Sequence, residues 1–277
     1  MNKIKEIQYN VKKAQQKLNA IWNKNGRNMY WWIGRKNFGD LITEEMATKF
    51  NFTPVHCYPE KADFIGAGSL LQMLPTNFSG SILSTGIIEP RNIELPNAKF
   101  LSVRGELTKE VLGLDKELAT GDLGLISNLL IQDNIFEKKY ELGLIPHYVD
   151  KSAPWLNLVK EIYGKKCLII DVEQTAKKVT EQIAKCNFVI SSSLHGIIVA
   201  DSLQVPCSWI GLSDSVVGNG FKFHDYASSI DSSIVKYAPS ELDSVKKIEK
   251  SFDIKDYSII KSKQREIAGL FQFALYN

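Results

Sequence analysis

The sequence is poor in the residues that most often form a metal site, a redox site or a membrane span. Its 277 residues include four cysteines and four histidines. There is no CxxC pair, and no histidine lies three to five residues from another histidine or cysteine, so zinc-ligand spacing is missing. No uninterrupted apolar run approaches the ~20 residues that a membrane-spanning helix needs. We therefore predict no metal, no cofactor and reduced cysteines.

The sequence also has little net charge. It carries 34 lysines and arginines against 31 aspartates and glutamates, a formal charge of +3. This balance is too even to indicate a nucleic-acid partner. The first residues are charged and contain no apolar signal core, so we expect a cytoplasmic protein. With 44% hydrophobic residues, the chain is expected to fold, and its length suits about two domains.

Glycine-containing turns separate short apolar strands from helices along most of the chain. This order is typical of an α/β protein with parallel sheets, whose ligands bind beyond the carboxyl ends of the strands. The polar stretch 132–139 separates two such series, which predicts domains at 1–135 and 136–258 and a C-terminal helix at 259–277. Helices are expected at 3–24, 40–50, from 70, and at 108–112, 155–163, 176–186 and 195–203. Strands are expected at 29–33, 63–66, 81–84, 99–103, 141–146, 168–171, 188–191 and 207–211.

The first expected helix is amphipathic. Its apolar residues recur at helical spacing and form one stripe, which consists of Ile4, Ile7, Val11, Ala14, Leu18 and Ile21.

The segment 187–211 carries the strongest chemical signal. An apolar strand ends in the serines 191–193, and His195-Gly196 then opens a helix of small and apolar residues. Such a turn presents backbone N–H groups and the positive end of a helix dipole, so it can hold an anion. The serines add hydroxyl donors, His195 titrates near neutral pH, and Gly196 allows close approach of a ligand. The alternative is that the serines cap the helix and that His195 is a structural histidine.

This segment resembles the core motif of the polysaccharide pyruvyl transferase family, which has a strand, a serine-rich turn, Leu-His-Gly and an apolar helix. Other pieces resemble the family's motifs in the same order, so that the matches together cover about residues 30–226. These pieces are Asn37-Phe38-Gly39-Asp40, Gly66-Ala67-Gly68-Ser69, Val103-Arg104-Gly105, Thr120-Gly121-Asp122, Ile145-Pro146-His147-Tyr148 and Lys222-Phe223-His224-Asp225-Tyr226.

The resemblance implies an enzyme that takes pyruvate from phosphoenolpyruvate and places it as a cyclic ketal across two hydroxyls of a saccharide. The acceptor would belong to a surface polysaccharide or its lipid-linked precursor, so contact with the inner face of a membrane would be peripheral at most. The family's fold is similar to the two-lobed GT-B architecture, which implies two Rossmann-like lobes with the site in the cleft. In that architecture the final helix crosses back to the first lobe, and we expect 259–277 to do so.

The resemblance also implies roles for single residues. His195 matches the position of the acid/base group. Arg104 follows a strand and is the expected cation for the carboxylate or phosphate of the donor. Ser192, Ser193 and Gly196, with the start of the following helix, would complete a phosphate cradle.

Ser193 departs from the pattern of the family. Some members have an arginine at this position, two residues before the motif histidine, so one donor-binding cation is missing here. Lys222 is the expected substitute, and His224 is expected to assist it, unless both lie in a solvated loop.

The first lobe and the segment Ile145-Pro146-His147-Tyr148 contain further residues that are expected at the cleft. Residues expected to line the cleft or contact the acceptor are Asn37, Asp40, Gly68 and His147. For Asp40 the alternative is that it caps the helix that follows. Trp31 and Trp32 are neighbours on a strand, so one is expected in the core and the other at the surface. Asp122 either faces the cleft or shapes the turn between the lobes.

Two other functions fit parts of the sequence. Glu173 and Glu181 have the spacing that some GT-B glycosyltransferases use for a nucleotide sugar. The missing cation at Ser193 would also suit a non-catalytic relative that only binds an anion or a sugar.

Overall fold

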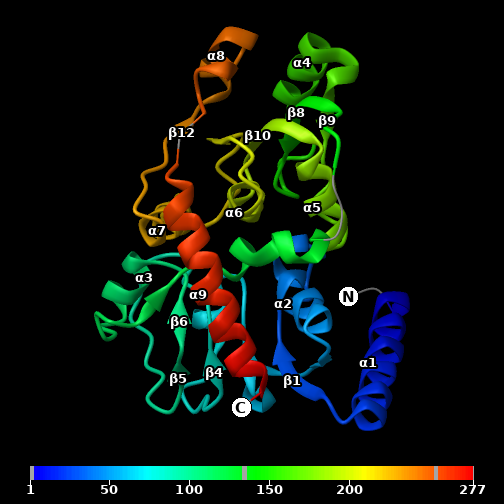
Figure 1. The fold of residues 1–277 in the computed structure, drawn as a ribbon, viewed down its shortest axis with the longest axis vertical. Coiled ribbons are helices and arrows are strands. Elements are labelled where there is room, and N and C mark those ends of the chain that lie inside the picture. The colour runs from blue at the N-terminus through cyan, green and yellow to red at the C-terminus, as the bar shows by residue number, and fades with distance from the viewer. Residues whose placement is uncertain (1–2, 133–135, 253–254, 277) are drawn as a thin grey trace.

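The computed structural model describes residues 3–132, 136–252 and 255–276, and these form two α/β lobes stacked along the long axis of the molecule (Figure 1). Each lobe contains a parallel five-stranded sheet. This arrangement confirms the predicted fold class, with two Rossmann-like lobes.

The first lobe is built on the sheet β2-β1-β3-β4-β5. Its strands are β1 (Gly26–Tyr30), β2 (Thr53–His56), β3 (Phe64–Ile65), β4 (Ser81–Ile82) and β5 (Lys99–Phe100). Its helices are α1 (Lys3–Asn23), α2 (Phe38–Lys49) and the short 3₁₀ turns η1 (Pro59–Lys61) and η2 (Leu71–Met73). The strand order reverses between β1 and β3, which is the switch point where ligands bind in such sheets.

The second lobe repeats this topology. Its sheet has the order β12-β11-β10-β8-β9, so β8 and β10 correspond to β1 and β3 of the first lobe. Its strands are β8 (Tyr140–Ile145), β9 (Cys167–Ile169), β10 (Cys186–Ser191), β11 (Cys207–Ile210) and β12 (Lys236–Tyr237). Its helices are α4 (Pro154–Tyr163), η4 (Gly164–Lys166), α5 (Ala176–Ala184), α6 (Leu194–Ser202), α7 (Phe221–Ser229), η5 (Pro239–Glu241) and α8 (Val245–Glu249).

The lobes share a continuous apolar core. The small sheet of β6 (Ser102–Val103) and β7 (Ala119–Thr120), with α3 (Glu106–Val111) between its strands, leads into η3 (Leu123–Ile131). The mostly apolar η3 lies between the lobes and contacts α2, α5 and α6. Its buried side chains belong to one cluster with residues of both lobes, so the two halves are fixed against each other.

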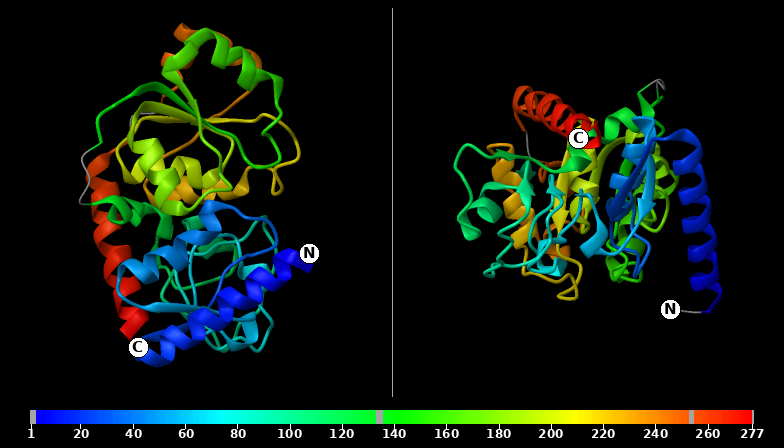
Figure 2. Two further views of the ribbon diagram at one scale, coloured as in Figure 1. Left: turned by 90° about the vertical axis from the view of Figure 1, so that its right-hand side faces the viewer. Right: turned by 90° about the horizontal axis from the view of Figure 1, so that it is seen from below.

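The C-terminal helix α9 (Tyr257–Tyr276) runs alongside both lobes and ends beside the first sheet (Figures 1 and 2). Phe271 is fully buried and packs edge-on against Phe50 and Phe64 of the first lobe. Arg27 of β1 donates a hydrogen bond to the carbonyl group of Leu275 (2.6 Å). The predicted return of this helix to the first lobe is confirmed. Within the described ranges, no helix is both long and apolar enough to span a bilayer.

Several predicted boundaries are corrected by the structure. The strand expected at 29–33 ends at Tyr30, with Trp31 buried in the core and Trp32 41% exposed, as the alternation predicts. The sequence gives no clear sign of β2 because it contains Pro54, and this proline is tolerated because β2 is an edge strand. The helix α7 and the turn η3 were not expected. The predicted domain boundary at 135 lies outside the described residues.

Candidate active site

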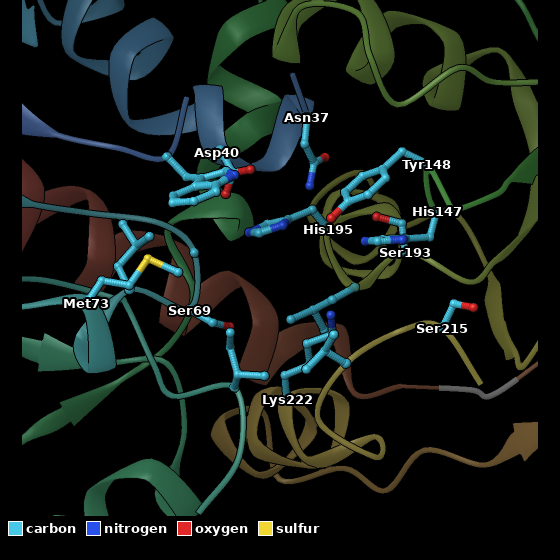
Figure 3. A pocket seen from close by; sticks show the side chains of 16 residues that line it. Asn37, Asp40, Ser69, Met73, His147, Tyr148, Ser193, His195, Ser215 and Lys222 are labelled. Atoms are coloured by element: carbon cyan, nitrogen blue, oxygen red, sulfur yellow. The ribbon is translucent and has the colours of Figure 1, made fainter. Parts of the chain in front are cut away.

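A cavity of about 230 Å³ lies where the switch points of the two sheets face each other. In the first lobe Tyr30 pairs with Ile65, and in the second Ile145 pairs with Ser191. Each pair is formed by the last residues of two adjacent strands, so the turns that follow them start at the same level. These four turns, together with α2, α6 and α7, surround the cavity (Figure 3).

The cavity brings together seven of the predicted site residues. Its wall includes Asn37, Asp40, Gly68, His147, Ser193, His195 and Lys222, with Trp32, Ser69, Met73, Ile88, Tyr148 and Ser215 among their neighbours. The wall therefore combines polar and charged side chains with apolar ones.

The start of α6 is open to the cavity. The hydroxyl of Ser191 donates to the carbonyl groups of Ile145 and Ser193 (3.0 and 2.8 Å), and that of Ser192 donates to Asp150 (2.6 Å). Ser193 is the N-cap residue of α6 but makes no capping hydrogen bond. The alternative in which the serines cap the helix is therefore wrong. The first amides of α6 and the positive end of its dipole are left for an anion.

His195 lies on the first turn of α6, between the cavity and the core. Its Nε2 atom is buried without a hydrogen-bond partner and lies 3.8 Å from Oδ1 of Asp122. Its ring lies directly over Gly39, where a Cβ atom would come within 2.0 Å of Nδ1. Burial, helped by the charges of Arg104 and Lys222, lowers the pKa of His195 to about 3. The imidazole is therefore neutral in the free protein at neutral pH.

Asp122 lies behind His195, outside the wall of the cavity. Of its two expected orientations, it therefore has the one that shapes the turn between the lobes. Its Oδ1 atom accepts a hydrogen bond from the amide of Gly124 (2.8 Å) and caps η3, while Oδ2 has no partner. Burial raises the pKa of Asp122 to about 7, against the opposing effects of Gly124 and Arg104. A proton can therefore remain on this carboxyl near neutral pH.

Asp40 and Lys222 border the cavity from opposite sides (Figure 3). Asp40 does not cap α2, because Asn37 does so by accepting a hydrogen bond from the amide of Gly39 (3.3 Å). Burial raises the pKa of Asp40 to about 7, opposed by Lys222. Burial, together with the charge of Arg104, lowers the pKa of Lys222 to about 8. Both groups therefore titrate close to neutral pH.

Arg104 does not line the cavity, so the role predicted for it is corrected. Its fully buried side chain donates from Nε to Asp225 Oδ2 (2.8 Å), from Nη1 to Ser69 Oγ (2.6 Å) and from Nη2 to the carbonyl of Ile87 (2.6 Å). Asp225 lies on α7, about one turn after Lys222. Arg104 therefore holds Asp225 and Ser69, and its side chain does not border the cavity.

Three other predicted donor-binding residues also lie outside the wall of this cavity. The hydroxyl of Ser192 is bound to Asp150, and Ser192 borders an adjoining cavity of about 280 Å³. Gly196 packs against Ser191, where a Cβ atom would come within 2.3 Å of the hydroxyl oxygen, so packing explains this glycine. His224 is exposed on α7, edge-on to Trp209.

His147 does face the cavity, with its ring on that of Tyr148 (centroids 4.1 Å apart). Burial and the nearby charge of Lys222 lower the pKa of His147 to about 4, so this imidazole is also neutral. The glutamates of the glycosyltransferase alternative are not in the wall. Glu173 instead pairs with Arg35 and Lys151.

Two contacts near the cavity were not predicted from the sequence. No role was expected for Asp225 beyond its place in the piece 222–226, although its spacing of three from Lys222 would place both on one helix face. Asp150 binds the hydroxyls of Ser192 and Ser213 and so ties two turns beside the cavity together. No local sequence signal indicates that contact.

Comparisons with known proteins identify a family for the chain. Residues 39–214 match the family described as polysaccharide pyruvyl transferase. An uncharacterized protein of Acanthamoeba polyphaga mimivirus is 29% identical over 214 residues, which cover 72% of this chain and 73% of that protein. The succinoglycan biosynthesis protein ExoV of Rhizobium meliloti (strain 1021) is 27% identical over 219 residues, which cover 76% of this chain and 66% of that protein.

The buried ion pair yields a first prediction. Asp225→Asn should lower the free energy of unfolding by about 3–5 kcal/mol, because it leaves the guanidinium of Arg104 buried without a countercharge. Urea unfolding followed by circular dichroism measures this. The control is Glu173→Gln, which removes a partly exposed partner of Arg35 and should cost about 1 kcal/mol or less. Equal effects of the two substitutions would contradict the importance of the buried pair.

Proposed function

The chain belongs to the polysaccharide pyruvyl transferase family, and we propose that it transfers pyruvate from phosphoenolpyruvate to two hydroxyls of a sugar, forming a cyclic ketal. The acceptor would be a surface polysaccharide, such as an exopolysaccharide or capsule, or its lipid-linked precursor. The relative named for succinoglycan biosynthesis supports a saccharide acceptor.

The observation that carries this proposal is the convergence of anion-binding groups on one small cavity. Phosphoenolpyruvate carries a carboxylate and a phosphate on three carbons, so its site must supply several donors at close range. The open start of α6, Ser193 and Lys222 supply them from one side, and Ser69 supplies a further hydroxyl. A cavity of about 230 Å³ suits a donor of this size next to one sugar ring.

Lys222 takes the place of the cation that some family members have at the position of Ser193. Both residues border the same cavity, so a lysine from α7 can reach the place where an arginine from the turn after β10 would lie. Lysine binds phosphate as a point charge rather than through a fork of two hydrogen bonds. Its helix is fixed by the pair between Asp225 and Arg104.

The proposed reaction needs one proton delivered and two removed. Protonation of the methylene carbon of phosphoenolpyruvate makes the adjacent carbon electrophilic, and one sugar hydroxyl attacks that carbon. The bond to the phosphate oxygen breaks, and the second hydroxyl closes the ketal. The hydroxyls lose two protons, of which one balances the proton taken by the methylene carbon and the other leaves with phosphate.

We assign delivery of the proton to His195. Its imidazole is neutral in the free protein, because burial and the nearby cations disfavour its charged form. A bound trianion offsets those cations and so raises the pKa of His195. The carboxyl of Asp122, 3.8 Å away and able to hold a proton near neutral pH, is the group from which His195 would receive it.

We assign removal of the acceptor proton to Asp40. This carboxyl lies across the cavity from Lys222, so a sugar between them would present its hydroxyls to Asp40 while the donor stays beside Lys222. Its raised pKa, about 7, makes it a better base than an ordinary aspartate at neutral pH. Trp32, which is 41% exposed at the cavity, offers an aromatic face to the sugar ring.

Donor binding tests the choice of donor and the role of Lys222 together. Phosphoenolpyruvate should raise the melting temperature, whereas UDP-sugars should not. Lys222→Ala should weaken phosphoenolpyruvate binding by a factor of about 10 to 100, because a charge-assisted contact is worth about 1.5–3 kcal/mol. Isothermal titration calorimetry measures the affinity.

His224→Ala is the matched control on the same helix, and its affinity should equal that of the unaltered protein because His224 is exposed outside the cavity. Stabilisation by UDP-sugars alone would favour the glycosyltransferase alternative. Binding without any turnover would favour a non-catalytic relative.

The pH dependence tests Asp40 and Lys222 as a pair. The value of kcat/KM for phosphoenolpyruvate should rise as Asp40 loses its proton near pH 7, and it should fall toward alkaline pH as Asp122 and then Lys222, near pH 8, lose theirs. Lys222→Arg should remove the part of the fall near pH 8, because arginine stays charged, and Asp40→Asn should remove the acid limb along with most of the rate. An alkaline fall that is unchanged in Lys222→Arg would contradict the role of Lys222.

A further inference from the structure

The helix α1 rests on the first lobe with its polar side. Gln16 donates a hydrogen bond to Glu44 (3.1 Å) and accepts one from the amide of His56 (3.4 Å). Lys12 forms an ion pair with the same Glu44. Amphipathic helices of globular proteins ordinarily bury the apolar face instead.

From Val11 onward, the apolar side of α1 therefore faces solvent. Val11 is 64% exposed, Leu18 53%, Ile21 73% and Trp22 83%. Their spacing of three, four and seven places them on one side of the helix. Figures 1 and 2 show α1 at the outer edge of the first lobe, with no other element over it among the described residues. A contiguous exposed patch of this kind marks an interaction surface.

The helix is also strongly basic. Residues 3–24 contain six lysines and one glutamate, a charge of +5 in a chain whose total is +3, so the rest of the chain is net negative. The exposed Lys17 lies beside the stripe, and the exposed Lys24 directly follows the helix. A Trp-containing apolar stripe beside lysines is the pattern of helices that lie in a membrane interface.

We propose that α1 docks the protein on an anionic phospholipid surface. Val11, Leu18, Ile21 and Trp22 would enter the boundary between headgroups and acyl chains, and the lysines would lie near the lipid phosphates. Charge complementarity favours this occupant over a second copy of the chain, because two stripes facing each other would bring two segments of charge +5 together.

The helix α1 lies beside a groove that reaches the candidate active site. Trp32 borders both the active-site cavity and this groove of about 390 Å³, which runs under α1 and includes Lys12 and Gln16. The groove connects the polar side of α1 with the cavity, while the exposed apolar residues of the helix face away from it. Membrane binding itself does not depend on the proposed reaction.

Vesicle co-sedimentation of the full chain tests the proposal. Vesicles of phosphatidylcholine with phosphatidylglycerol should bind the protein, pure phosphatidylcholine should bind it far less, and added salt should weaken binding. Leu18→Gln/Ile21→Gln should reduce binding at least about tenfold, because two apolar side chains are lost without a change in charge. Emission from Trp22, identified with Trp22→Phe, should shift to shorter wavelength on the anionic vesicles.

The matched control is Asn19→Gln, which places the same side chain at an exposed position off the stripe and should bind within about twofold of the unaltered protein. Absence of binding to anionic vesicles, or equal loss in the double variant and in this control, would overturn the proposal. The proposal would also be overturned if the unaltered protein were a dimer in solution and Leu18→Gln/Ile21→Gln converted it to a monomer. Pyruvyl transfer to a soluble acceptor should be the same in the unaltered protein and in all these variants. If none of them transfers pyruvate, the result counts against the proposed function and not against membrane docking.

Discussion

The ion pair between Arg104 and Asp225 is the contact on which the geometry of the site depends. Both side chains are fully buried, and the pair joins the end of β6 in the first lobe to α7 in the second. The chain makes room for it with glycine: a Cβ atom at Gly86 would come within 2.6 Å of the guanidinium carbon, and one at Gly105 within 1.7 Å of the carbonyl oxygen of Asp225. A buried pair of this kind tolerates little displacement, so it fixes α7, and with it Lys222, relative to the first lobe.

The electrostatics of the cavity follow from that arrangement. Lys222 and the open start of α6 place positive potential at the cavity, where burial keeps part of Asp40 protonated near neutral pH, while His195 and His147 are kept neutral by burial and by nearby cations. The proposed donor would meet these groups already in place. The small net charge of the chain conceals this arrangement, because it averages a basic segment 3–24 and a slightly acidic remainder that contains Lys222.

The sequence predicted what depends on local pattern. Alternating strands and helices indicated the fold class, and the turn from Ser191 to Gly196 indicated a place that borders the cavity, because both follow from hydrophobic periodicity and from the chemistry of strand ends. It did not predict the partner of Arg104, which lies 121 residues away along the chain. Nor did it show that Asn37 rather than Asp40 caps α2, or that α1 docks by its polar side, since tertiary contacts decide both.

The central claim is that this cavity joins pyruvate to a saccharide. The most direct measurement is mass spectrometry of candidate glycans incubated with the protein and phosphoenolpyruvate, together with an assay for released phosphate. The account predicts a product heavier by one pyruvate less one water, equimolar phosphate, and neither of them with His195→Ala. Phosphate release without a glycan product, the same product from His195→Ala, or addition of a sugar from a nucleotide sugar instead would contradict it.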